Sequence, residues 1–147
     1  MMIMTGAPPA ADAERGQAIS VLAIGIVAML IMVAGLVIDG GQKAAAISRA
    51  ESAAAGAARA AANAGAGGTL STGGDHAVAR SQASEAARNY LRQTAVGTGP
   101  KVTGTVTVDG AEVHVHTTVT VTTIFLSLIG IDRLSAAGDA TARVVPT

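Results

Sequence analysis

Hydrophobic and polar positions change their pattern along the chain, and the first pattern is an unbroken apolar stretch. From Ala18 to Ile38 the sequence has 21 residues without a charge, of which only Ser20 is polar. At ~1.5 Å of rise per residue, a helix over this stretch is about 31 Å long, which matches a hydrocarbon core of ~30 Å. A helix also satisfies its own backbone amides, as lipid requires. The stretch therefore predicts a single transmembrane helix over residues 17–39.

Two other interpretations of the apolar stretch agree less well with the sequence. A buried core helix needs large side chains around it, and the rest of the chain is poor in them. A cleaved secretory signal has a basic start and an apolar stretch of only ~7–15 residues, whereas here the preceding residues 1–16 include Asp12 and Glu14. Because residues 1–16 also contain Pro8, Pro9 and many small residues, we predict that they form a disordered leader.

In the second pattern, over residues 40–66, 14 positions are alanine and few of the others carry large side chains. Alanine has the highest helix propensity, so we predict that the transmembrane helix extends into an alanine-rich helix. An alanine surface buries little area and suits close contact with other helices better than a self-sufficient core. Gly25 and Gly35 add small residues to the span itself, where they would also let a partner helix approach. The membrane-exit motif between the two parts consists of Asp39, Gly40 and Gly41.

The middle of the chain carries a linker and a second helical pattern. Residues 67–74 are rich in glycine, serine and threonine, which predicts a flexible glycine-rich linker. Asp75 is a favourable N-cap residue. Apolar side chains at helical spacing then predict an amphipathic helix over residues 75–96, which Gly97 and Pro100 end.

The last third of the chain, residues 101–145, alternates valine with threonine at the period of two that is typical of antiparallel strands. Asp109-Gly110 predicts a tight hairpin turn. On the strand after it the valines share one face, and His114 and His116 lie on the other face with threonines. The apolar segment from Ile124 to Ile131 is too short to cross a bilayer. We expect a turn or short helix there, packed on the alanine-rich helix or touching the membrane surface, and then a third strand.

Composition argues against several classes of function. The 147 residues include 10 basic and 10 acidic side chains, which give a net charge of zero, and only Tyr90 and Phe125 are aromatic. Nucleic-acid binding needs a basic surface and usually rings for base stacking, so we predict none. The absence of cysteine removes disulfides, thiolate metal sites and cysteine nucleophiles. Because no catalytic motif is recognisable, we predict no enzyme activity, no cofactor and no small-molecule substrate.

His114 and His116 are the candidate metal ligands. Two positions apart on a strand, they place two imidazoles on one face, where both can reach one ion. No third ligand has an obvious place beside them, and paired histidines on a solvent-facing strand are usually surface residues. We therefore predict no metal site.

Several of these segments together resemble a known protein family. Arg15-Gly16 precedes the uncharged span, Leu36-Val37-Ile38-Asp39-Gly40-Gly41 closes it, Ala53-Ala54-Ala55-Gly56-Ala57-Ala58 follows, and the chain approaches its end with Ala140-Thr141-Ala142. In this order the segments resemble Flp/Tad pilus-assembly proteins of the TadE/TadG type. The resemblance implies a minor pilin-like or assembly role in a bacterial envelope filament or secretion apparatus. It also implies a pilin-like plan, in which a protruding helix carries a small antiparallel sheet.

The resemblance makes Gly16 a possible leader cleavage site. Processed pilins of this group typically have a glutamate five residues after the glycine, whereas this chain has Val21 at that position. In pilins that carboxylate pairs with the N-terminus of a neighbouring subunit. Its absence makes head-to-tail polymerisation as a major subunit less plausible.

Charge and family resemblance differ on the orientation in the membrane. Arg15 lies on one side of the span, and Lys43 and Arg49 lie on the other. By itself the positive-inside rule slightly favours a cytoplasmic C-terminal domain. The resemblance implies the opposite, and we follow it: a single-pass protein of a bacterial cell membrane, with a cytoplasmic N-terminus and an extracytoplasmic C-terminal domain.

The sequence thus predicts an α+β, pilin-like protein that acts as a structural membrane component of a Tad-type pilus or a related secretion apparatus. Its expected partners are the lipid bilayer and other pilus-assembly or secretion subunits, contacted through the membrane and alanine-rich helices. The alternative is a membrane-tethered extracytoplasmic binding module unrelated to pili, whose Val/Thr sheet recognises a small ligand or a cell-wall component. The predicted parts are a leader (1–16), a transmembrane helix (17–39), an alanine-rich helix (40–66), a linker (67–74), an amphipathic helix (75–96) and an antiparallel β region (101–145).

Overall fold

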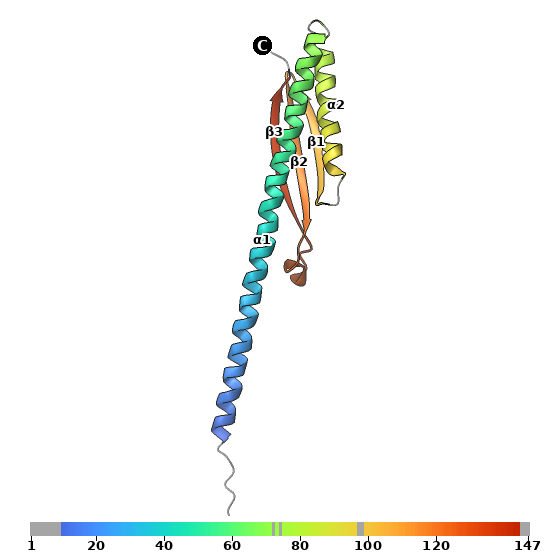
Figure 1. Cartoon of the computed structure of the whole chain (residues 1–147). Helices are drawn as coiled ribbons and strands as arrows, with labels where there is room; N and C mark the ends of the chain where they lie inside the picture. Colours follow the sequence, from blue (N-terminus) through green and yellow to red (C-terminus); the bar gives the residue numbers. More distant parts are fainter. Residues whose placement is uncertain (1–9, 72, 74, 97–98, 145–147) are drawn as a thin grey trace, which may run out of the picture.

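The computed structural model describes residues 10–71, 73, 75–96 and 99–144, and it confirms the predicted α+β class. One long helix carries a second helix and a three-stranded antiparallel sheet along its C-terminal half (Figure 1). This part, in which the sheet and α2 pack on α1, is called the head below. The elements in chain order are α1 (Ala10–Ser71), α2 (His76–Ala95), β1 (Lys101–Asp109), β2 (Glu112–Thr122), the 3₁₀ helix η1 (Leu126–Ile129) and β3 (Arg133–Arg143).

Helix α1 is longer at both ends than the sequence patterns predict. It begins at Ala10, inside the segment expected to be a disordered leader, where three alanines within four positions favour a helix. It ends at Ser71, inside the expected linker, because tertiary packing outweighs the low propensity of glycine. A Cβ atom at Gly68 would lie 3.0 Å from the Cα atom of Ala79, so the missing side chain is what lets α2 pack there. Residues 1–9, 72 and 74 of these two segments lie outside the described residues.

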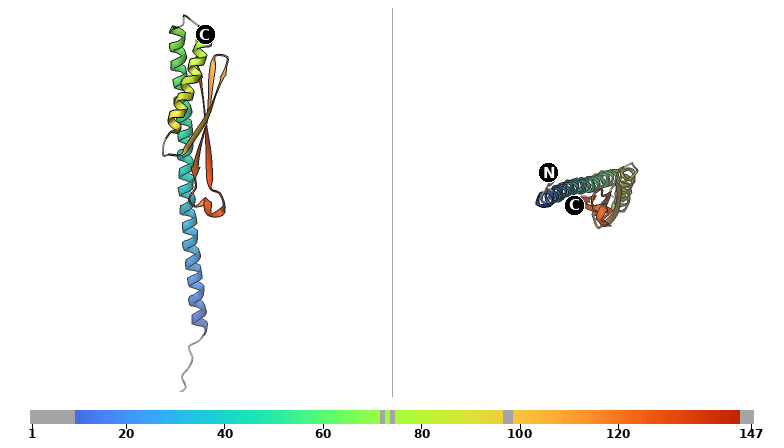
Figure 2. Two further views of the ribbon diagram at one scale, coloured as in Figure 1. Left: turned by 90° about the vertical axis from the view of Figure 1, so that its right-hand side faces the viewer. Right: turned by 90° about the horizontal axis from the view of Figure 1, so that it is seen from below.

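Helix α2 runs back along the C-terminal part of α1 (Figures 1 and 2). Its start is fixed by Asp75, whose carboxylate accepts hydrogen bonds from the amides of Ala77 at 2.9 Å and Val78 at 3.3 Å, as its N-cap position predicts. The buried residues of α2 repeat every four positions and so form one face toward the core: Ala79, Ala83, Ala87 and Leu91.

The sheet has the strand order β1-β2-β3, with both pairs antiparallel. Gly110 adopts a φ of 57° in the turn between β1 and β2, a backbone conformation that glycine adopts without steric cost. The valines of β2 face the helices and are buried, while His114 and His116 lie on the exposed face, as the alternation predicts. Helices α1 and α2 both pack on the valine face, α1 mainly against β2 and β3 and α2 against β1.

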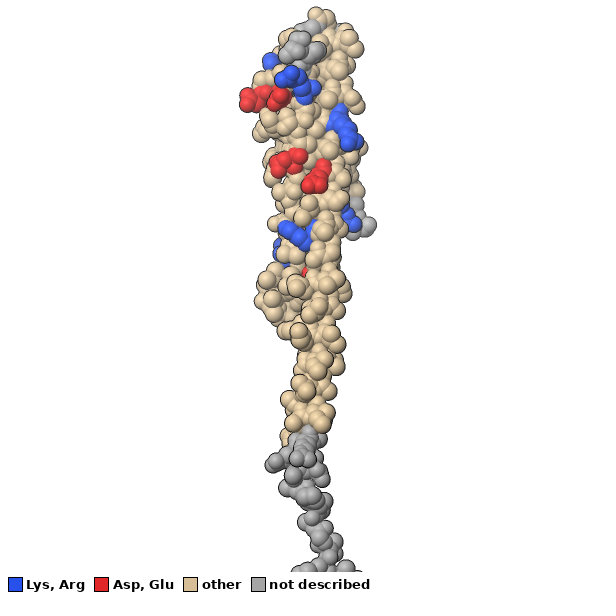
Figure 3. All heavy atoms as spheres, turned by 90° about the vertical axis from the view of Figure 1, so that its left-hand side faces the viewer, with Lys and Arg blue, Asp and Glu red and all other residues tan. Residues whose placement is uncertain are grey.

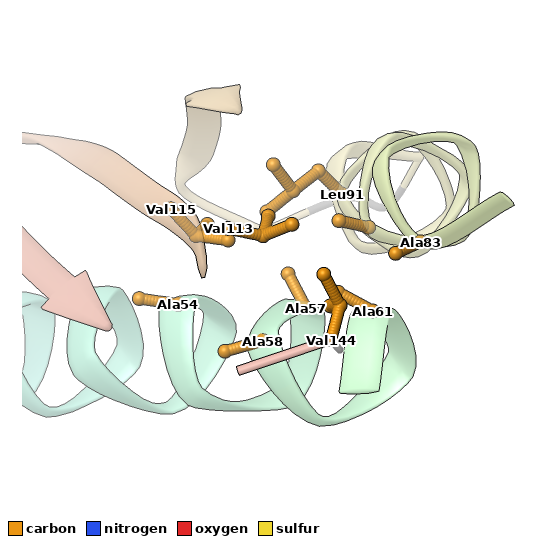
Figure 4. Packing of buried hydrophobic residues seen from close by; sticks show 10 residues of the cluster. Ala54, Ala57, Ala58, Ala61, Ala83, Leu91, Val113, Val115 and Val144 are labelled. Carbon is orange, nitrogen blue, oxygen red and sulfur yellow. The ribbon is translucent and has the colours of Figure 1, made fainter. Parts of the chain in front are cut away.

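The core is built from small residues, so the backbones approach closely. Alanines from α1 and α2 meet Val113 and Val115 of β2 with few large side chains between them (Figure 4). A Cβ atom at Gly138 would lie 2.4 Å from the carbonyl carbon of Ala50, which shows how near β3 runs to α1. The buried hydroxyl of Thr117 donates to the carbonyl oxygen of Ala50 at 2.7 Å. One face of the alanine-rich segment therefore packs against the sheet of the same chain.

Candidate functional site

From Gln17 to Ile38, α1 extends beyond the head with every residue except Gly35 exposed, and this part is called the bare half of α1 below. Its large apolar side chains are exposed around the helix, for example Ile19 at 68%, Leu30 at 62% and Met32 at 72%. From Gln17 to Ile38 the described residues include no charged side chain, and the face in Figure 3 shows uncharged atoms below the head. This half belongs to a helix long and apolar enough to cross a membrane. An exposed surface of this size and composition requires lipid or other helices around it.

Asp39 stands where the bare half of α1 meets the head, and its side chain is fully buried. One carboxylate oxygen, Oδ1, accepts the N–H of Ile124 at 2.9 Å. The other, Oδ2, accepts the N–H groups of Phe125 at 3.0 Å and Leu126 at 2.7 Å. These three hydrogen bonds compensate the carboxylate for its loss of water. Asp39 thus ties the segment after β2 to α1.

The reason for this connection is the start of η1, which has no side-chain cap of its own. Phe125, at the N-cap position, offers no hydrogen-bonding side chain. Thr123, two residues earlier, donates its hydroxyl to the carbonyl oxygen of Ile131 and so does not cap η1. The first N–H groups of a helix need acceptors when they are buried. Asp39 supplies them from 85 positions earlier in the sequence.

Gly35 lies one turn before Asp39 on the same face of α1 and completes the contact. It is buried, and a Cβ atom there would lie 2.4 Å from Cγ of Phe125. The ring of Phe125 therefore occupies the space that a side chain would take. The sequence predicts that Gly35 would admit a partner helix, whereas the structure places Phe125 of the same chain against it. Gly25, by contrast, has nothing within 4 Å of a built Cβ atom.

The predicted membrane-exit motif divides into two kinds of residue. Asp39 is buried and makes the contacts described above. Gly40 and Gly41 are exposed within the continuous helix, and a Cβ atom at either would meet nothing within 4 Å. Sequence reasoning singled out Asp39 for its position after the span and missed its role as a cap. The other half of the contact, a short helix without a capping residue at its start, lies in the apolar segment 124–131, and only the fold connects the two.

The two histidines each have a nearby partner on β3. His114 Nδ1 lies 3.0 Å from the hydroxyl of Thr141, and His116 Nδ1 lies 2.6 Å from Oδ1 of Asp139. Within the described ranges, no group of three His, Asp or Glu side chains is arranged to hold a metal ion. The pair therefore belongs to the exposed polar face of the sheet.

Basic side chains gather on the head just beyond the bare half of α1. Arg49, Lys101 and Arg133 line an open groove of about 840 Å³ between α1 and the sheet. Nearby, the ammonium group of Lys43 donates to the carbonyl oxygen of Ser135. Figure 3 shows blue atoms low on the head, above the uncharged surface of the bare half of α1.

Comparison with known proteins gives a family match over part of the chain. No curated protein and no solved structure gives a significant match. The matched range includes the bare half of α1, Asp39 and most of the alanine-rich segment. Residues 16–64 match the model of the putative Flp pilus-assembly TadE/G-like family, which confirms the resemblance over that range and, with the apolar helix, supports a membrane protein with a pilus-related role.

Proposed function

We propose that this protein is a structural membrane component of a Tad-type pilus or a related secretion apparatus, which works through lateral contacts of α1 and through its head. The observation that carries the proposal is the continuity of α1. The bare apolar half and the half that carries the sheet form one helix, and the family match covers the junction between them. The head is thereby held at a fixed place relative to the membrane.

The exposed side of α1 supports lateral contact with other subunits. Beyond the span this side is exposed and consists largely of small residues, among them Ala44, Ser48 and Ser52. Small side chains let another helix approach closely, so that packing and interhelical hydrogen bonds contribute to association. The alanine-rich segment would then serve two contacts, one with its own sheet and one with a neighbouring subunit.

Site-specific photo-crosslinking in cells that assemble the pilus tests this role. A photoreactive residue at Ser48 should give a covalent adduct with another pilus-assembly subunit. The same residue at Thr105, which is exposed on β1 away from α1, serves as the matched control and should give much less adduct. Deleting the gene should also reduce piliation. Normal piliation after deletion, together with no adduct from Ser48, would overturn the proposal.

The proposed orientation places the N-terminus in the cytoplasm and the head outside. Because the chain has no cysteine, a single Cys in place of Thr105 can report the location of the head, and one in place of Thr5 can report the opposite side of the span. A membrane-impermeant maleimide should label the Thr105→Cys variant in intact cells and the Thr5→Cys variant only after lysis. The reverse pattern would place the head in the cytoplasm and exclude a filament role.

A further inference from the structure

The segment around η1 presents a cluster of exposed apolar side chains, which we call the apolar tip. Leu128 is 82% exposed and Ile129 is 69% exposed, and with Ile124 at 59% and Ile131 at 43% they complete the tip. Asp39 holds the start of this segment through the N–H groups of Ile124, Phe125 and Leu126, and the N–H of Ile131 donates to the carbonyl oxygen of Leu126 at 3.0 Å, so the tip is a defined structure and not a loose loop. An apolar cluster of this kind, at the end of the head where the sheet meets the apolar part of α1, marks a contact with something apolar.

The position of the tip along α1 identifies what that contact is. Phe125, in the same segment, packs on Gly35, which lies three residues before the end of the apolar stretch at Ile38. At ~1.5 Å per residue, this contact lies about 4–5 Å inside the span. In Figure 1, η1 is the lowest part of the head and lies beside α1. The tip therefore lies at the depth of the last turn of the helix that lipid surrounds.

Apart from the buried Asp39, the charged side chains of the head lie beyond this level. Lys43 stands four residues beyond Asp39, or about 6 Å along the helix, which agrees with a headgroup layer of ~5–7 Å on each side of the hydrocarbon core. Asp132 and Arg133 follow the tip directly, and both are exposed.

We propose that the apolar tip inserts into the bilayer beside α1 and forms a second membrane contact of the head. The side chains of Leu128 and Ile129 enter the boundary between headgroups and acyl chains, the depth at which amphipathic elements of peripheral proteins bind. Lys43 and Arg133 remain in the headgroup layer. The inference requires that α1 spans the membrane, and it does not depend on a role in pili.

Tryptophan fluorescence of the full chain in phosphatidylcholine vesicles tests the proposal, because the protein has no tryptophan of its own. Leu128→Trp places a reporter on the tip. Leu70→Trp, a matched leucine that is 86% exposed near the far end of α1, is the control, and Leu30→Trp reports the middle of the span. Lipids brominated near the carbonyl end or near the methyl end of the acyl chain quench at shallow or deep positions.

The proposal predicts blue-shifted emission from Leu128→Trp, with stronger quenching by the shallow bromines than by the deep ones. Leu30→Trp should show the opposite order, and Leu70→Trp should emit as in water without quenching. Red-shifted, unquenched emission from Leu128→Trp would place the tip in water. Blue-shifted but unquenched emission would show that protein covers it. Either result overturns the proposal, and Ile129→Trp provides an independent second reporter, with circular dichroism to verify that each variant is folded.

Discussion

Replacing Asp39 by alanine should release η1 from α1 while leaving the rest of the head folded. The carboxylate accepts three backbone N–H groups, at 2.9, 3.0 and 2.7 Å. Hydrogen bonds to charged groups contribute ~1.5–3 kcal/mol each. The variant also loses the desolvation cost of a buried carboxylate, and water can reach part of the released segment, so we expect a net loss of about 3 kcal/mol in the local stability of η1.

Hydrogen exchange of the amides of residues 124–126 measures this loss directly. A change of about 3 kcal/mol corresponds to roughly 100-fold faster exchange, because each 1.4 kcal/mol is a factor of ten. Asp139→Ala is the control. Its carboxylate is 75% exposed and pairs with His116 at the surface, so exchange at residues 124–126 should not change. Unchanged exchange in Asp39→Ala itself would refute the reasoning and show that η1 is held by its apolar contacts alone.

Three further predictions concern the core and the N-terminus. Gly138→Ala should lower the stability of the head by about 1–3 kcal/mol in thermal unfolding, because its new Cβ atom would meet the backbone of Ala50. Gly40→Ala has open space and should raise the stability of the helix by up to ~1 kcal/mol. Equal shifts of the two variants in thermal unfolding would contradict this. Thr117→Val should cost about 1 kcal/mol in chemical unfolding by losing one buried hydrogen bond, and a neutral result would mean that the hydroxyl contributes nothing. Because the glutamate of processed pilins is missing, the bond between Gly16 and Gln17 should stay intact in the purified protein, and mass spectrometry of its peptides should find one that spans this bond; a protein whose N-terminal residue is Gln17 would establish cleavage.

Elements that depend on local chemistry could be predicted from the sequence. The apolar stretch from Ala18 to Ile38, the cap at Asp75 and the alternation of valine and threonine in β2 each carry their own signal. In these cases the residues that decide the structure lie within a few positions of each other. The α+β class followed from them, and the family resemblance placed the sheet beside a protruding helix.

The site at Asp39 could not be predicted, because its partners are 85 to 87 positions away. Before the fold is known, nothing connects a carboxylate after a span with an uncapped short helix after β2. Gly35 was misinterpreted for the same reason, since its missing side chain accommodates Phe125 of the same chain. The end of α1 was placed too early because glycine lowers helix propensity locally, while the packing of Gly68 against α2 depends on tertiary structure.

Because α1 is one continuous helix, a tilt of its membrane part also tilts the head. From Asp39 to Ser71 the helix extends about 48 Å beyond the span. A tilt of ~20°, an ordinary value for transmembrane helices, would displace its far end sideways by about 16 Å. The turn at Gly110 lies toward that far end (Figure 2). A small change of angle within the bilayer is thereby amplified into a large movement at the outer surface of the head, without any change in its fold.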